Sequence, residues 1–299
     1  MINHLTYLLR LAQERHFGRA AEACGVSQPT LSAGIRQLEE TLGVLLVRRG
    51  SRYQGLTPEG EAVLVWARRI VADAQAMRDE VRTLRADVTG HLRLAVVPTA
   101  LAVAARITTA FASRHPVVTF SLLSRTSDEI LAGLDDLAVD AGLTYLDAEP
   151  IGRVRRVPLY RERYCAITPA HGPLGTRPDL DWADLAAVPL CLLTGDMQNR
   201  RIIERKLKTA GVLEAPTLES DSLLALLAHV RAGAWTTVVP VSVAPLLDHA
   251  GYARSVPISD PDGGPTIGLI YPARDPLTPA LAAFVRTVLE TKPSIAHTL

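Results

Sequence analysis

The sequence of 299 residues contains only three cysteines, Cys24, Cys165 and Cys191. Their odd number and wide spacing indicate neither a disulfide framework nor a zinc site, so we expect no bound metal. Unpaired thiols are typical of proteins in a reducing compartment, which predicts a cytoplasmic protein.

Long apolar runs and a large net charge are absent as well. No apolar stretch of about eighteen residues is free of charged side chains, so we expect no membrane span. Residues Met1–His4 lack the basic and apolar pattern that opens a signal peptide. The formal net charge is only +1, so any contact with nucleic acid must come from a local patch. The hydrophobic content of 48% is ordinary for a globular protein, and the length allows about two or three domains.

Residues 1–57 have the pattern of short helices joined by tight turns. After a helix near Arg19–Cys24, Gly25 supplies a turn and Ser27 is a good N-cap for the next helix. That helix has apolar residues at helical spacing on one face and polar residues on the other, which predicts a helix-turn-helix. Its polar face carries residue types that read base edges in the major groove of DNA. The candidate contacts are Gln28, Pro29, Thr30, Ser32 and Arg36.

The segment 47–57 combines three arginines with two glycines and predicts a hairpin wing. We expect Arg48 and Arg52 to reach DNA phosphates or a minor groove. A helical pair or an arginine-rich turn is most often structural when it occurs alone. The adjacency of the two features is what favours DNA binding here.

Residues 58–88 predict one long linker helix that follows the cap at Thr57 and begins with Pro58. Its apolar residues are spaced alternately four and three residues apart, which is typical of a heptad seam. A seam of this length predicts pairing with a second chain, and packing on its own domain is the alternative. The seam comprises Val63, Ala67, Ile70, Ala74, Met77, Val81, Leu84 and Val88.

From His91 onward, predicted strands alternate with helices, which indicates parallel α/β layers. We divide residues 91–299 into a first lobe, about 91–165 and 266–292, and a second lobe, about 166–265. The chain would cross between them at Thr168–Pro169 and near Pro265, leaving a hinge and a cleft. Three strand ends place hydroxyl groups at helix starts, where free N–H groups favour an anion. These hydroxyls also suit ordinary helix caps, which is the alternative interpretation.

The first sixty residues resemble the LysR family of bacterial transcription regulators. The matching positions are Phe17-x-Arg19-Ala20-Ala21, Val26-Ser27-Gln28-Pro29-Thr30-Leu31-Ser32, Ile35-x-x-Leu38-Glu39-x-x-Leu42-Gly43, Leu46-x-Arg48 and Leu56-Thr57-Pro58-x-Gly60. The resemblance implies an α/β multi-domain protein with an all-α winged helix-turn-helix head, a linker helix and a two-lobed effector domain like a periplasmic binding protein. Two positions depart from the family: Val47 replaces an aromatic residue, and Trp235 replaces the second glycine of a Gly-x-Gly turn.

The resemblance also implies a function and partners. The protein would regulate transcription by binding double-stranded DNA at an interrupted inverted repeat, without a cofactor. It would assemble as a dimer of dimers, and RNA polymerase is a further candidate partner. A small effector, expected to be anionic, would bind between the lobes. The effector-binding residues that the resemblance favours are Thr99, Ala100, Thr126, Ser127, Thr194 and Gln198.

Three other classes of protein fit the sequence less well than a regulator. An enzyme is disfavoured because we find no Gly-x-Ser-x-Gly elbow, P-loop or metal-spaced histidine pair. A solute-binding transport protein would account for residues 91–299 only. A redox sensor would need reactive thiols, and Cys165 and Cys191 both lie in apolar strand-like runs, where thiols react poorly.

Overall fold

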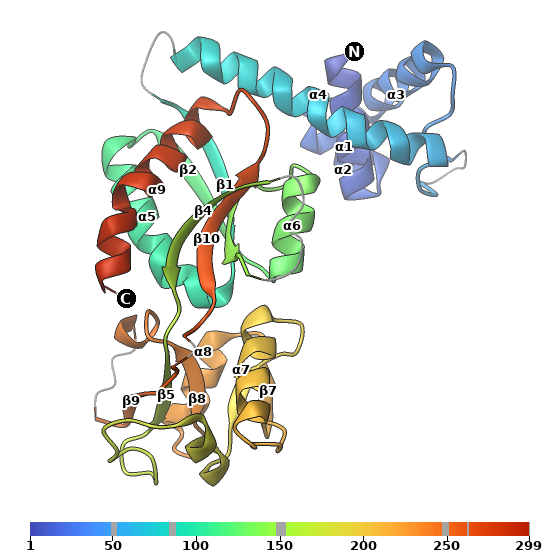
Figure 1. The fold of residues 1–299 in the computed structure, drawn as a ribbon. Helices are drawn as coiled ribbons and strands as arrows, with labels where there is room; N and C mark the ends of the chain where they lie inside the picture. Colours follow the sequence, from blue (N-terminus) through green and yellow to red (C-terminus); the bar gives the residue numbers. More distant parts are fainter. Residues whose placement is uncertain (49–52, 84–87, 148–153, 247–250, 262, 299) are drawn as a thin grey trace. The chain divides into compact units, whose positions relative to one another are not determined.

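The computed structural model describes the whole chain except residues 49–52, 84–87, 148–153, 247–250, 262 and 299 (Figure 1). The chain forms two units, of which the first comprises residues 1–87 with 277–279 and the second comprises 88–276 with 280–299. The predicted order of a helical head, a long helix and a mixed α/β domain is confirmed.

The described residues of the first unit form the helices α1 (Ile2–Glu14), α2 (Phe17–Ala23), α3 (Gln28–Leu42) and α4 (Pro58–Thr83). Helix α2 begins two residues before the predicted Arg19, because the His16 ring caps it and accepts the N–H groups of Gly18 and Arg19. Gly25 makes the turn with φ +65°, and the Ser27 hydroxyl accepts the Thr30 N–H at 3.3 Å. The predicted helix-turn-helix is therefore confirmed.

Val47, which stands where the LysR family has an aromatic residue, is part of the core of the first unit. It is buried and forms an antiparallel bridge with Leu56 at the base of the wing. The chain then enters α4 through Thr57, whose hydroxyl accepts the Gly60 N–H at 2.9 Å. A Cβ atom on Gly60 would lie 2.1 Å from the Leu46 carbonyl oxygen, so glycine is required for this close approach.

Helix α4 differs from the predicted seam in its first half. Val63 and Ala67 pack into the core of the first unit, and Ala67 is 0% exposed, because α1 covers this face. Ala67 is therefore unavailable to a second chain, so the seam as predicted is wrong at this position, and Val63 is partly occupied within its own unit. Leu84 lies outside the described residues, and Val88 belongs to the second unit. The large apolar side chains that α4 does expose are Val65, Trp66, Ile70, Met77 and Val81.

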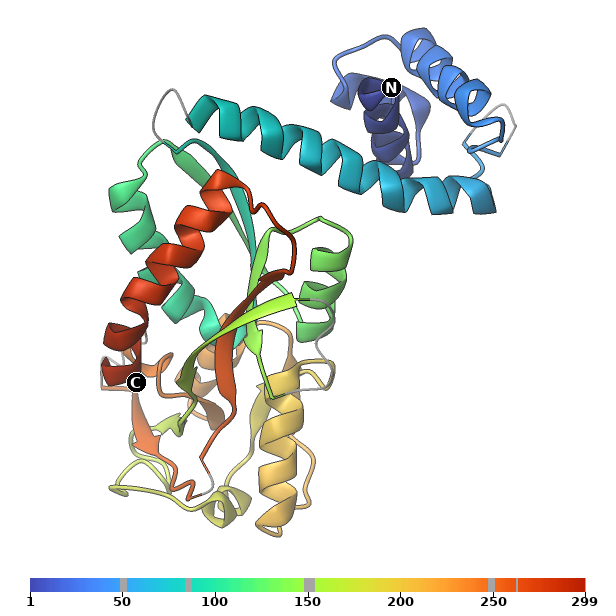
Figure 2. The same cartoon turned by 45° about the horizontal axis from the view of Figure 1, so that its top comes forward.

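The first lobe of the second unit is built on a five-stranded sheet of order β2-β1-β3-β10-β4. Strands β2 and β3 run parallel to β1, while β10 is antiparallel to both β3 and β4. Helices α5 and α9 lie on one face of the sheet and α6 lies on the other (Figures 1 and 2). The elements are β1 (Gly90–Val96), η1 (Pro98–Ala100), α5 (Leu101–Arg114), β2 (Val118–Ser124), α6 (Ser127–Asp135), β3 (Ala141–Tyr145), β4 (Val154–Arg161), β10 (Thr266–Pro272) and α9 (Pro279–Thr298).

The second lobe contains the antiparallel sheet β8-β5-β9 and the parallel pair β6-β7. A bridge between Leu190 and Thr236 joins the two. The elements are β5 (Tyr164–Pro169), η2 (Trp182–Ala187), β6 (Cys191–Leu193), α7 (Gln198–Thr209), β7 (Leu218–Ser220), α8 (Leu223–Arg231), β8 (Thr237–Pro240), η3 (Ala244–Leu246) and β9 (Ala253–Pro257).

Two expectations about these lobes need correction. The sheets are mixed rather than all parallel, because the chain crosses between the lobes twice and the returning β10 pairs against its neighbours. The first crossing lies between Arg161 and Tyr164 rather than at Thr168–Pro169, because β5 stays paired with β9 through Pro169. Cys165 therefore belongs to the second lobe.

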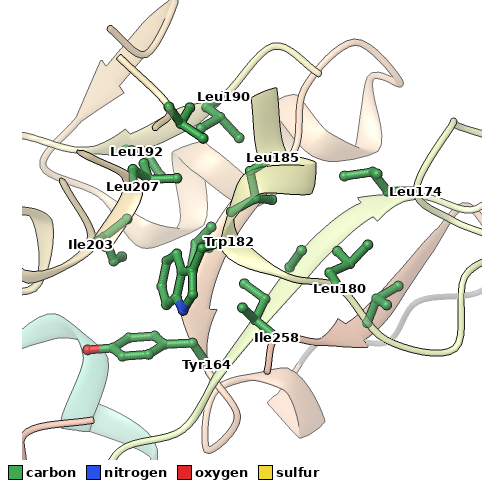
Figure 3. Close-up of a cluster of buried hydrophobic side chains, with 14 residues drawn as sticks. Tyr164, Leu174, Leu180, Trp182, Leu185, Leu190, Leu192, Ile203, Leu207 and Ile258 are labelled. Carbon is green, nitrogen blue, oxygen red and sulfur yellow. The ribbon is translucent and has the colours of Figure 1, made fainter. Parts of the chain in front are cut away.

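The core of the second lobe gathers around Trp182, which η2 presents to β5 and α7. The ring of Tyr164 packs edge-on against Trp182, with ring centroids 5.6 Å apart. Figure 3 shows the hydroxyl of Tyr164 pointing away from this cluster. The Tyr164 hydroxyl therefore lies outside this apolar cluster and bonds to Glu162 at the first crossing between the lobes.

Candidate DNA-binding surface and effector cleft

The predicted DNA-reading residues of α3 share its outer face. Gln28, Pro29, Thr30 and Arg36 are exposed and Ser32 is half-buried, while the opposite face of the helix packs into the core. Gly34 allows that packing, since a Cβ atom there would lie 2.7 Å from the Tyr7 ring. The hydroxyl of Thr30 is already bonded to that of Ser27 at 2.8 Å. Gln28 and Arg36 are therefore the long polar side chains best placed to reach bases.

The base of the wing is tied to α3 by Glu39, a residue whose role the sequence reasoning missed. Its Oε1 accepts the N–H groups of Leu46 at 2.8 Å and Val47 at 3.1 Å. Arg48 is exposed, and its Nε donates to the Leu56 carbonyl at 3.0 Å. Arg52, the predicted wing contact, lies outside the described residues. Residues 1–57 contain seven arginines and four glutamates, so the local charge is more positive than that of the whole chain.

Of the six predicted effector-binding residues, the structure brings only Ser127 and Gln198 to one cleft. Thr99 and Ala100 are buried, and the hydroxyl of Thr126 caps α6 by accepting the Glu129 N–H. The Thr194 hydroxyl is buried beneath the start of α7 and has no hydrogen-bond partner in the described part of the chain.

The cleft lies between α6 of the first lobe and α7 of the second and has a volume of about 1030 Å³. Thr144 and Tyr145 at the end of β3 contribute to its wall, together with residues 260–261 and 263–265 of the second crossing. Ser127 accepts a hydrogen bond from Thr144 at 2.9 Å, so its hydroxyl is oriented within the wall. A space of this size suits a small organic ligand.

Helix α7 lines the cleft with Arg201, Arg205 and Lys206. Arg201 lies 3.9 Å from Asp128 across the cleft, and Lys206 pairs with Asp260 at 2.6 Å. The side chain of Arg205 is exposed, and its guanidinium has no ion-pair or hydrogen-bond partner within the described ranges, while its backbone carbonyl accepts from the Thr209 hydroxyl. The spacing from Gln198 to Arg201 to Arg205 is three and four residues, so a helical wheel would have found this stripe from the sequence.

A group of five polar side chains, the interlobe cluster, occupies the junction where the effector was expected near Thr99. It comprises Thr99, Tyr145, Glu162, Tyr164 and Asn199. Tyr145 donates to Glu162 at 3.3 Å and accepts from Asn199 at 3.3 Å and from Thr99 at 2.9 Å. The Tyr145 hydroxyl therefore donates one hydrogen bond and accepts two, which is its full capacity. The Thr99 hydroxyl is bonded to this group and does not face an open space that a ligand could fill.

Cys165 and Cys191 are both buried in one apolar cluster of the second lobe. Burial raises the pKa of each thiol to about 11. Each thiol donates weakly to a backbone carbonyl, Val239 and Leu226 respectively. Both are therefore in the protonated form that reacts poorly at neutral pH.

Within the described residues, no group of three or more histidine, cysteine or carboxylate side chains could hold a metal ion. Among the helices described, none combines the length and apolar character needed to cross a bilayer.

Comparison with known proteins accounts for both units. Residues 2–61 match the family "Bacterial regulatory helix-turn-helix protein, lysR family", and residues 85–293 match the "LysR substrate binding domain". The DNA-binding transcriptional dual regulator OxyR of Escherichia coli K12 is 30% identical over 277 residues, covering 92% of this chain and 90% of OxyR.

Two solved structures extend the likeness to the fold. A full-length OxyR variant from Pseudomonas aeruginosa superposes with a TM-score of 0.77 at 27% identity, covering 99% of this chain and 96% of that one. Full-length CbnR in complex with its target DNA gives a TM-score of 0.70 at 26% identity, covering 97% and 99%.

Proposed function

Because the chain belongs to the LysR family of DNA-binding transcription regulators, we propose that α3 reads an interrupted inverted repeat in double-stranded DNA. Gln28 and Arg36 would contact base edges, with Pro29, Thr30 and Ser32 packed against the groove. Arg48 and Arg52 would contact the backbone beside it. The exposed polar face of α3 and the arginine excess of residues 1–57 support this assignment.

Two copies of the chain would pair through α4, and two pairs would form a dimer of dimers. The contact stripe comprises Trp66, Ile70, Met77 and Val81, which recur at intervals of four, seven and four residues. Trp66 is 63% exposed and Met77 is 60% exposed, which leaves a large apolar area uncovered in one chain. Pairing would bring two α3 helices to the two half-sites. RNA polymerase would be contacted from this DNA-bound assembly.

The effector would be a small anion bound in the α6–α7 cleft. The observation that carries this assignment is the guanidinium of Arg205, a cation in the cleft wall whose charged group has no protein partner in the described part of the chain. Arg201 would help, because its contact with Asp128 at 3.9 Å is long enough to be exchanged for a ligand carboxylate or phosphate. The buried Thr99 would then contribute to the wall only through Tyr145.

The test uses the intrinsic fluorescence of the full chain, since Trp182 lines the cleft. A panel of succinate, citrate, benzoate and inorganic phosphate is titrated into the wild type and into Arg205→Gln. A hydrogen bond to a charged group contributes about 1.5–3 kcal/mol, so Arg205→Gln should weaken an anion that binds by roughly tenfold or more. Lys208→Gln is the matched control, because Lys208 pairs with Glu204 on the same helix and does not line the cleft. Equal affinity in both variants, or no binding of any anion, contradicts the assignment.

Peroxide sensing is a second candidate function, because OxyR relatives in other strains of Escherichia coli are named hydrogen peroxide-inducible genes activators. The burial of Cys165 and Cys191 and their raised pKa values argue against it in this chain. We therefore favour a regulator that responds to a bound anion.

A further inference from the structure

Glu162 is a carboxyl group placed at the first crossing between the lobes. Its residue is 1% exposed, although glutamate is almost never fully buried without a charged partner. Its backbone N–H donates to Pro265 at 2.9 Å, which ties the first crossing to the second. A Cβ atom on Gly264 would lie 2.2 Å from the Glu162 carbonyl oxygen, so the two crossings are in close contact here. The carboxyl therefore lies at the hinge itself.

The hydrogen bonds of this carboxyl connect both lobes. Oε2 accepts from Tyr145 of the first lobe at 3.3 Å and from Tyr164 of the second lobe at 3.0 Å. Tyr145 in turn accepts from Asn199 at the start of α7 at 3.3 Å. Oε1 is buried and accepts no hydrogen bond in the part of the chain that is described. Separating the lobes would break the Tyr145–Asn199 bond and admit water to the carboxyl.

The surroundings of Glu162 oppose a negative charge. Burial raises the pKa of this carboxyl to about 8, even though the hydrogen bonds from Tyr164 and Tyr145 act to lower it. Within the described residues, the titratable side chains that interact with it are three tyrosines, Tyr145 on β3, Tyr160 on β4 and Tyr164 on β5. Asp260, near the second crossing, adds negative charge next to Tyr164. The nearby cations are engaged elsewhere, since Arg161 donates to the Gly264 carbonyl and Lys206 pairs with Asp260.

We propose that Glu162 is a proton-controlled latch, whose neutral form keeps the two lobes joined as in the structure and whose ionised form favours their separation. An ionised carboxylate buried among tyrosines lacks the water or cation that it needs. Opening of the hinge supplies that water. The joined arrangement therefore binds the Glu162 proton more tightly than the separated arrangement does. Tyr145 belongs both to this cluster and to the wall of the α6–α7 cleft, which couples the latch to the cleft.

The direction and range of the effect follow from linkage. A solvated glutamate has a pKa of about 4.3, and the pKa of Glu162 in the joined arrangement is about 8. Between these two values, the ratio of separated to joined molecules should rise by up to about tenfold per pH unit. Above pH 8 the ratio should stay constant, because both arrangements are then ionised.

The experiment measures the distance between the lobes in the full chain by pulsed dipolar spectroscopy. Spin labels are attached at Ser113→Cys on α5 and Leu213→Cys in the second lobe, in a Cys24→Ser background. Both positions are exposed, and Cys165 and Cys191 are buried. Labelled protein is mixed with an excess of unlabelled protein, so that distances within one chain dominate.

We expect the wild-type distances to shift between pH 5.5 and 8 and to stay constant above that range. Glu162→Gln should abolish the shift, and Glu204→Gln, a half-buried carboxyl on α7 that pairs with Lys208, should leave it unchanged. Tyr145→Phe removes a bond that stabilises the carboxylate, so its plateau should begin at higher pH. A wild type that does not change, or an unaltered shift in Glu162→Gln, overturns the latch. If circular dichroism shows that Glu162→Gln does not fold, the test rests on Tyr145→Phe. A distance plateau that begins in Tyr145→Phe at the same pH as in the wild type, or at a lower pH, refutes the proposal.

Discussion

Replacement of Glu39 by alanine tests how the recognition helix and the wing are held together. One carboxylate oxygen of Glu39 accepts two backbone N–H groups, from Leu46 and Val47. Hydrogen bonds to a charged acceptor are worth about 1.5–3 kcal/mol each. Loss of both should lower the free energy needed to open the wing base by roughly 2–4 kcal/mol, after discounting for partial exposure.

Hydrogen exchange of the amides of Leu46 and Val47, followed by mass spectrometry, measures this opening directly. A change of 2–4 kcal/mol corresponds to exchange that is faster by about thirtyfold to a thousandfold. DNA affinity should fall in parallel, because Arg48 follows directly after the two anchored residues. Glu40→Ala is the matched control, since Glu40 is exposed and adjacent on α3. Unchanged exchange at both amides in Glu39→Ala would refute the argument.

Three further outcomes are expected. Trp66→Glu should lower the oligomeric mass in sedimentation, because a charge in the α4 stripe costs several kcal/mol to desolvate; Leu213→Glu, at a residue 80% exposed in the second lobe, should not. The thiols of Cys165 and Cys191 should react with a maleimide only as fast as the native protein opens, and rapid labelling would revive peroxide sensing. The pKa of Glu162 rises from 4.5 to about 8 on folding, so the folded state retains a proton that the unfolded chain loses in this range. The free energy of unfolding should therefore fall by up to about 1.4 kcal/mol per pH unit between these values, and Glu162→Gln should remove that part of the slope in denaturant titrations.

The helical head could be predicted from the sequence because its signals are local. The signals are the Gly25 turn, the Ser27 cap and the apolar spacing of α3, and each depends on residues within a turn or two of the chain. All three are present in the structure. The α4 seam could be predicted only in part. Periodicity identifies an apolar face but not its partner, and the core of the first unit covers Ala67, and Val63 in part, before a second chain could do so.

The effector site shows a similar division between local and long-range information. Hydroxyls at strand ends were correctly identified as helix starts, and Ser127 and Gln198 do line the cleft. Thr99 does not, because Tyr145 and Glu162 from two other strand ends fill the space in front of it. That arrangement depends on where the chain crosses between lobes, and the crossing at residues 162–163 has no strong local signal.

If α3 of this LysR regulator reads DNA as proposed, the protein should prefer a specific sequence. Selection of bound duplexes from a random library by the wild-type protein tests it most directly. We expect enrichment of an interrupted inverted repeat. The preference for at least one base of each half-site should be lost in Gln28→Ala or Arg36→Ala, since a bidentate contact supplies about 1–3 kcal/mol of discrimination. Enrichment of no sequence, or an identical preference in the wild type and both variants, would contradict it.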